Sequence, residues 1–261
     1  MNGVQKRFRG DVHIIRLAVL AAAWLVFMAI FKFNKFFTPI SFQTMGAQFP
    51  EFGLMALGVT LCMITGGIDL SVVGVANFAA ITSGLLLKAL AGEGELPGYG
   101  IPLTIVVGVL VGAIAGAFNG FLVSKVKIPP ILATLGSYEL FSGIAIVLTK
   151  GKAVSKLPMA YSELMAGKLF GVVPTQLLVF AVVAAFVGFL LSRTTYGPKL
   201  YMLGTSEKAA RFSGLKNDRL LMKTYMLSGI CAALGGLIML ANYNSARADY
   251  GTVYTLQCVL I

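Results

Sequence analysis

Seven long apolar segments constrain the fold of this chain more than any other feature. A helix rises about 1.5 Å per residue, so about 20 apolar residues cross the hydrocarbon core of a bilayer. The segments are Leu17–Phe31, Gly46–Thr65, Val72–Leu90, Ile101–Val123, Ile131–Leu148, Val172–Ser192 and Thr224–Ala241. Lipid offers no hydrogen-bond partners to the backbone, so segments of this kind fold as helices. The sequence therefore predicts an all-α fold, a polytopic transmembrane helical bundle.

The charge composition fits a chain surrounded by membrane lipid. Only 12% of the residues are charged and 57% are hydrophobic, whereas a soluble domain carries about 25% charged residues. The net charge of +11 arises from basic residues in the loops between apolar segments. Positive loops are retained in the cytoplasm during insertion, and this accounts for the charge better than binding to nucleic acid. We therefore expect no nucleic-acid partner.

The cysteines and the single histidine give no sign of catalysis or metal binding. Cys62, Cys231 and Cys258 lie in apolar segments without close spacing, and His13 is the only histidine. The sequence also lacks the phosphate-binding G-x-x-x-x-G-K-[ST] run. The sequence therefore predicts no catalytic residue, no metal site, no disulfide framework and no nucleotide hydrolysis by this chain itself.

A basic segment, Arg193–Lys223, separates the last two apolar segments. It holds nine charged residues, of which seven are basic, so we expect this loop and the basic N-terminal tail in the cytoplasm. Residues 91–100 and 242–255 are then outside. A short helix is predicted within the loop, because Ser206 offers a capping oxygen, Glu207 suits the positive helix end, and Gly214 permits a left-handed end.

Two glycines predict a helix break before the third apolar segment. Gly66 and Gly67 precede Asp69 and Ser71, and either polar side chain could cap the helix that restarts there. A carboxyl group near a membrane helix is also a candidate site on a solute path. We favour capping for Asp69, and for Asn119 we favour a hydrogen bond between helices over contact with a solute.

A stripe of glycines lies in the fourth apolar segment. Gly108, Gly112, Gly116 and Gly120 are four residues apart and therefore share one helix face. Small residues on one face let a neighbouring backbone approach closely. We interpret this stripe as a packing surface.

Four sequence blocks, in this order, resemble the sugar-type permease subunits of bacterial ABC importers. They are GGIDLS at 66–71, FNGFLVSKVKIPPILATLGS at 118–137, GIAIVLTKGK at 143–152 and YGPKLYMLGTSEKAARFSGL at 196–215. The resemblance runs from about residue 53 to the last residue. It is to relatives of the ribose, xylose and galactose permeases and, more distantly, of the branched-chain amino acid permeases. It implies a type II importer permease fold, with residues 1–261 as one transmembrane domain. The run Leu256–Ile261 is then the start of an eighth span, and we expect further C-terminal spans that this sequence lacks.

The same resemblance implies a function and a set of partners. The chain would translocate a monosaccharide or similar small polar solute across the bacterial inner membrane. It would act with a cytoplasmic ATPase that binds the ATP, a periplasmic solute-binding protein and a second permease subunit. Glu207, Ala209, Ala210 and Gly214 match a loose form of the E-A-A-x-x-x-G loop that docks on the ATPase, with both alanines forming a small contact face. The translocation path or its helix break would involve Gly66, Gly67, Asp69, Ser71 and Asn119.

Other transport functions stay open on the sequence alone. An ion-coupled secondary transporter would need ionisable groups near its spans, and the candidates are Glu51, Asp69, Lys88 and Glu139. A permease for branched-chain amino acids or nucleosides is a second alternative. Loss of uptake with an uncoupler, as opposed to loss with ATP depletion, separates the secondary transporter from the ATP-driven permeases.

Overall fold

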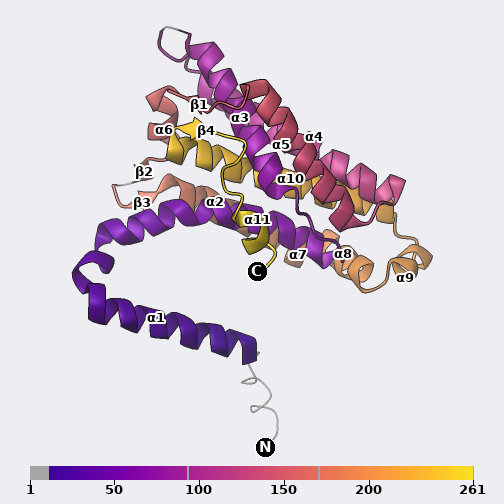
Figure 1. Cartoon of the computed structure of the whole chain (residues 1–261). Coiled ribbons are helices and arrows are strands. Elements are labelled where there is room, and N and C mark those ends of the chain that lie inside the picture. The colour runs from indigo at the N-terminus through magenta and orange to yellow at the C-terminus, as the bar shows by residue number, and fades with distance from the viewer. Residues whose placement is uncertain (1–11, 93, 170, 261) are drawn as a thin grey trace, which may run out of the picture. The chain divides into compact units, whose positions relative to one another are not determined.

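The computed structural model describes residues 12–92, 94–169 and 171–260 (Figure 1). Seven helices in this part of the chain are long and apolar enough to cross a membrane. The chain divides into two compact units, with the boundary between Met45 and Gly46. The prediction of a polytopic helical bundle is confirmed. Its treatment as one domain stays a prediction.

The first unit contains α1 and the beginning of α2. Helix α1 spans Val12–Phe36 and bends at Lys32, whose backbone departs from helical angles. Helix α2 spans Pro39–Ile64, with Thr38 Oγ1 accepting a hydrogen bond from the Ser41 amide at 3.2 Å. Large apolar side chains such as Trp24 and Ile30 are exposed along α1. This pattern suits a helix surrounded by lipid.

The second unit is built around α10, which spans Asn217–Tyr243. Its long helices are α3 Val72–Ala91, α4 Gly100–Phe121, α5 Pro130–Thr149 and α7 Thr175–Arg193. Helix α10 packs most extensively against α4 and α3, and much of its length is buried. A short π-helix, η2 Leu122–Val126, extends α4 before the turn into α5.

The glycine stripe of α4 is the surface that meets α10. A Cβ atom on Gly116 would lie 2.9 Å from the Met226 Cα and would also clash with the Tyr225 carbonyl oxygen. Gly112 lies equally close to the Gly229 backbone. Two backbones that touch in this way leave no room for a side chain, so the packing interpretation of the stripe is confirmed.

Short elements cover one end of the second unit. There, β1 Val154–Ser155 pairs antiparallel with β4 Ser245–Ala246, in the register Val154 to Ala246. Helix α6 Met159–Met165 packs on α10, and β2 Lys168–Leu169 pairs with β3 Val173–Pro174. The β1–β4 pairing places the segment after α5 and the segment after α10 at the same end of this unit.

Two predicted boundaries are corrected by the structure. Segment 193–223 contains two short helices, α8 Tyr196–Thr205 and α9 Glu207–Phe212, not one. Helix α10 starts at Asn217, seven residues before the predicted span at Thr224. Near the predicted start of an eighth span the structure has one helical turn, α11 Tyr254–Gln257, and the eighth span stays a prediction.

Candidate functional site

Helix α9, between α8 and α10, has both of the ends that the sequence predicts. Ser206 Oγ accepts a hydrogen bond from the Ala209 amide at 3.2 Å and so caps the first turn. After the helix, Gly214 has a φ of +80°, a conformation that glycine adopts without strain. The short helix is therefore fixed at both ends by its own sequence.

The inner face of α9 is anchored to the membrane helices. Ala210 is fully buried in an apolar cluster that includes Leu203, Leu221 and Tyr225. Asn217 Nδ2 donates a hydrogen bond to the Glu207 carbonyl oxygen at 2.8 Å. Packing and a hydrogen bond therefore both hold α9 to α10.

The outer face of α9 is exposed. Lys208, Ala209 and Arg211 are exposed, and the Phe212 side chain is 92% exposed. The expectation that both alanines form a contact face is wrong for Ala210, which packs inward. Phe212, which sequence analysis missed, is the largest apolar group on this outer face, and a six-residue helix gave no periodicity that could have identified it.

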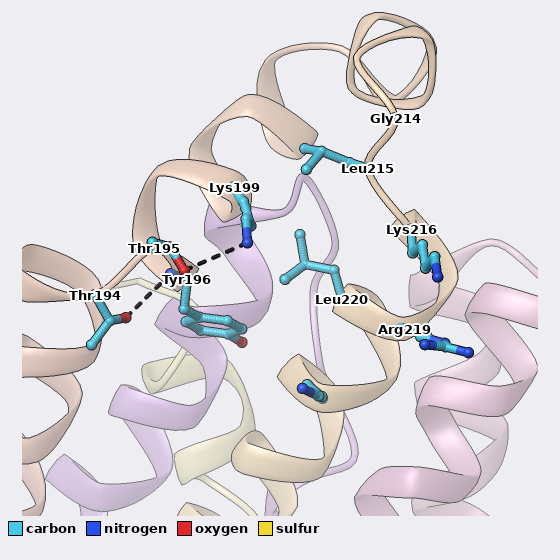
Figure 2. Close-up of a pocket in the computed structure, with 10 residues that line it drawn as sticks. Thr194, Thr195, Tyr196, Lys199, Gly214, Leu215, Lys216, Arg219 and Leu220 are labelled. Atoms are coloured by element: carbon cyan, nitrogen blue, oxygen red, sulfur yellow. Dashed lines mark hydrogen bonds between the residues drawn. The ribbon is translucent and has the colours of Figure 1, made fainter.

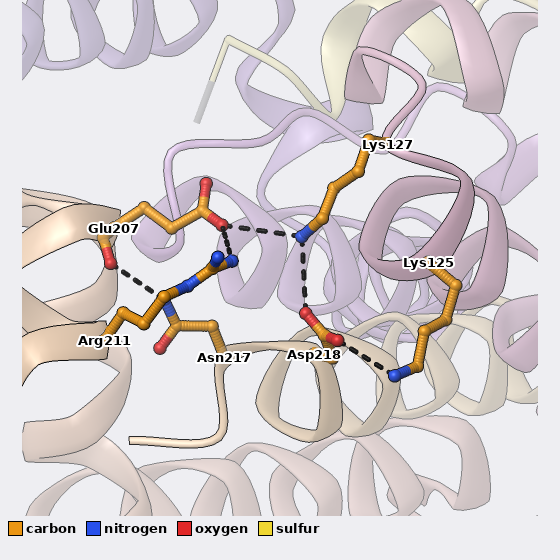
Figure 3. A network of polar contacts seen from close by, with 6 residues as sticks. All are labelled: Lys125, Lys127, Glu207, Arg211, Asn217 and Asp218. Carbon is orange, nitrogen blue, oxygen red and sulfur yellow. Dashed lines mark hydrogen bonds and ion pairs between the residues drawn. The ribbon is translucent and has the colours of Figure 1, made fainter. Parts of the chain in front are cut away.

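A network of ion pairs joins α9 to the neighbouring segments (Figure 3). Lys127 Nζ lies 3.6 Å from Glu207 Oε1 and 3.3 Å from Asp218 Oδ1, so one lysine bridges two carboxylates. Lys125 adds a 2.9 Å pair with Asp218, and Arg211 a 3.4 Å pair with Glu207. Exposed pairs contribute at most about 1 kcal/mol each. Their main effect is to set the positions of α9, α10 and the segment after η2.

The helix break after α2 lies directly beside α9. Gly66 has a φ of +83°, and a Cβ on Gly67 would lie 3.2 Å from Pro130 and close to the Tyr225 hydroxyl. A cavity of about 280 Å³ is lined by Gly66, Gly67, Glu207 and other residues of the break, α5 and α10. The structure thus brings together the two glycines and the E-A-A-like helix, which the sequence singled out separately.

Asp69 is the centre of a buried chain of hydrogen bonds. Its Oδ1 accepts from the Ser71 hydroxyl at 2.6 Å and from the Ser71 amide at 3.0 Å, and its Oδ2 accepts from Ser228 Oγ at 2.7 Å. Asn119 Nδ2 donates to Ser71 Oγ at 2.7 Å. Burial raises the pKa of the Asp69 carboxyl, and the hydrogen bonds from Ser71 and Ser228 oppose that shift. The chain connects α4, the start of α3 and α10.

The capping interpretation of Asp69 and Ser71 is wrong. Ser71 precedes α3 but makes no side-chain capping bond, and Asp69 binds the Ser71 amide outside the helix. Both residues and Asn119 are at most 1% exposed. For Asn119 the sequence favours a hydrogen bond between helices, and the structure shows such a bond. Ser228, the partner from α10, was missed because one serine in an apolar span carries no signal.

Glu51 is a second buried carboxylate, and the sequence indicates it only as a possible ion-coupling group. Glu51 on α2 accepts from Asn242 Nδ2 at 2.5 Å and from the Tyr243 hydroxyl at 3.2 Å. These bonds tie α2 to the end of α10. In the described ranges, no group of three or more His, Cys, Asp or Glu side chains could hold a metal ion.

The fold and this site define a class: a polytopic helical membrane protein with a rigid, exposed helix beside a helix break. A family model, the permease component of branched-chain amino acid transport systems, matches residues 42–261. The chain belongs to this family, and the resemblance to ABC importer permeases is confirmed. No solved structure matches the chain significantly.

Curated relatives are about one third identical to this chain over the residues that align. The autoinducer 2 import system permease protein LsrC of Escherichia coli (strain SMS-3-5 / SECEC) is 35% identical over 206 residues, 79% of this chain and 58% of the relative. The protein of the same name from Shigella flexneri is 34% identical over the same shares. The one from Yersinia pestis (strain Pestoides F) is 35% identical over 71% of this chain and 50% of the relative. The chain thus spans between half and three fifths of the length of these relatives.

Proposed function

We propose that this chain is the permease subunit of an ATP-binding-cassette importer in the bacterial inner membrane. It carries a monosaccharide or a similar small polar solute, and a separate cytoplasmic ATPase binds and hydrolyses the ATP. The observation that carries the proposal is α9, a capped helix whose inner residue Ala210 is buried while Phe212 is exposed. Membership of a permease family supports it.

The geometry supports a path for mechanical coupling. An ATPase that holds the outer face of α9 would move a helix fixed to α10 by Asn217 and by the apolar cluster around Ala210. The Lys127 ion pairs would carry the same movement to the segment between η2 and α5. The break at Gly66–Gly67 borders the same cavity and can change its backbone angles at low cost.

The remaining partners follow from the same assignment. A periplasmic solute-binding protein would meet the end that carries α6 and the β1–β4 pair, and a second permease subunit would complete the path. The relatives are named for the import of autoinducer 2, so this compound is a second solute to test beside monosaccharides. Uptake that stops on ATP depletion but survives an uncoupler is the expected outcome, and the reverse would favour an ion-coupled transporter.

We predict that the N-terminus and residues 193–223 are cytoplasmic, because the basic residues of the second unit concentrate at the α8–α9 end. The test uses Glu95→Cys and Ser206→Cys in a background in which Cys62, Cys231 and Cys258 are replaced. A membrane-impermeant thiol reagent added to intact cells should label the cysteine at 95 and spare the one at 206. Equal labelling of the two positions would refute this orientation.

We predict that Phe212→Ala weakens binding of the ATPase about tenfold or more, as the loss of an aromatic anchor at an interface does. Phe212 contributes nothing to the core, since its side chain is almost wholly exposed, so abundance in the membrane should not change. The measurement is the amount of ATPase that co-purifies with the chain, together with hydrolysis stimulated by the loaded binding protein.

The matched control is Phe189→Ala. Phe189 is also an exposed phenylalanine, 55% exposed, but it lies on the membrane helix α7. The same truncation there should leave ATPase binding unchanged. If the Phe212 variant retains its ATPase as well as the Phe189 variant does, α9 is not the docking element.

A further inference from the structure

A basic pocket opens beside α9, on the side formed by α8 and the start of α10 (Figure 2). Its volume is about 410 Å³. One wall comes from the segment that follows α7, with Thr194, Thr195 and Tyr196. The other wall runs from Gly214 into the first turns of α10. The roles proposed for α9 and for the helix break do not use this pocket.

The pocket is lined by four cations and no carboxylate. Lys199, Lys216, Arg219 and Lys223 are its charged residues, and all four are exposed. None of them forms an ion pair with another described residue. Lys199 Nζ donates only a long hydrogen bond, 3.5 Å, to Thr195 Oγ1. Four like charges therefore share one pocket without an internal counter-charge.

The nearby acidic residues are already engaged elsewhere. An adjoining pocket shares Lys216 and Arg219, and its one carboxylate is Asp218. Asp218 is bound to Lys125 and Lys127. Since that carboxylate is shared by two other lysines, the adjoining pocket adds positive charge to the region and does not neutralise it.

The local backbone also favours an anion. Helix α8 begins at Tyr196 and α10 begins at Asn217, so two helix N-termini lie at the pocket wall. The positive ends of the helix dipoles add to the field of the side chains. The hydroxyl groups of Thr194 and Thr195 are further hydrogen-bonding groups at the wall.

The position of the pocket indicates which kind of molecule supplies the anion. Its walls follow the last residue of α7, Arg193, and include the first turns of α10, so it lies where two candidate spans end. Farther along α7, Val182, Phe186 and Phe189 are exposed apolar side chains. The ends of membrane spans lie near the level of the lipid headgroups, and basic pockets between membrane helices on the cytoplasmic side bind anionic headgroups.

We propose that this pocket binds the phosphate group of an anionic phospholipid headgroup. The bound phosphate would offset the repulsion among the four cations and hold α8 against the start of α10. The proposal requires that the chain spans a membrane and does not require that it transports a solute. Its failure would leave the assignment as an importer permease intact.

The test measures binding of phosphatidylglycerol to the full chain. Wild type and variants are purified in a neutral detergent, and lipid retention is read by native mass spectrometry against phosphatidylcholine. The pocket variant carries Lys199→Gln, Lys216→Gln and Lys223→Gln. The control variant carries Lys150→Gln, Lys152→Gln and Lys156→Gln, which removes the same charge from three exposed lysines on the segment after α5. A parallel experiment replaces the lipid with inorganic phosphate.

Each outcome decides the proposal. We expect the pocket variant to bind phosphatidylglycerol about tenfold more weakly or worse, because basic residues beside an anionic headgroup strengthen its binding. The control should stay within twofold of wild type. Equal losses in the two variants, or no loss in either, would overturn the proposal. Inorganic phosphate that binds as well as the lipid would overturn the assignment to a headgroup. If the pocket variant no longer binds the ATPase but binds lipid as wild type does, the four cations contact the ATPase and not a lipid.

Discussion

Gly116→Leu should prevent the second unit from folding into a stable form. The glycine lies where α4 touches the backbone of α10, and a Cβ there would lie 2.9 Å from the Met226 Cα, with the Tyr225 carbonyl oxygen closer still. Backbone cannot move aside as the end of a flexible side chain can. The two helices would have to separate, which exposes α10, the most buried helix. We expect a loss well above the 1–3 kcal/mol of ordinary overpacking.

The measurement is the amount of monodisperse protein in detergent and its thermal unfolding midpoint. We expect either no accumulation or a midpoint lowered by roughly 10 °C, since 1 kcal/mol moves it by about 2–4 °C in a protein of this size. The matched control is Gly143→Leu on α5. A Cβ on Gly143 would meet nothing within 4 Å, so the same substitution should be tolerated. Equal stability of the two variants would contradict close packing between α4 and α10.

The membrane helices could be predicted from the sequence because apolar length alone defines a span. Their ends could not be predicted equally well. Asn217 and Asp218 are polar, so the hydrophobic run starts at Thr224 although the helix starts at Asn217. Hydrogen bonds from Asn217 to α9 and from Lys125 to Asp218 fix these first turns. Such contacts form between separate elements, and the local sequence pattern does not predict them.

In the candidate site, too, the sequence predicts features that depend on neighbouring residues but not contacts between separate helices. Ser206 and Gly214 predicted the ends of α9, because capping depends on residues within one turn of each end. The inward orientation of Ala210 depends on contacts with Leu203 and Leu221, which come from other helices. Asp69 is a candidate from sequence alone because it is an acidic residue in an apolar region. Its partner Ser228 is 159 positions away, so the bond between them follows only from the packing of α10.

Asp69→Ala should destabilise the chain by about 4 kcal/mol. The carboxylate accepts three hydrogen bonds, two from Ser71 and one from Ser228, and alanine would leave all three donors without their acceptor. Each buried donor that loses its partner costs about 1–3 kcal/mol, and water cannot substitute because the site is closed. The thermal unfolding midpoint in detergent should fall by roughly 10 °C. A midpoint that does not move would contradict a structural role for the buried chain of hydrogen bonds.

Asp69→Asn separates hydrogen bonding from charge at the same position. The amide oxygen can accept from Ser71, and the amide nitrogen can donate to Ser228 Oγ, because a hydroxyl both donates and accepts. We expect this variant to recover most of the stability lost by Asp69→Ala. Uptake then tests whether the Asp69 carboxylate also acts on the solute path. A variant that is stable and transports at the wild-type rate shows that Asp69 only joins helices. One that is stable but inactive would mean that the carboxylate acts on the solute path, which would require the closed site to open during transport.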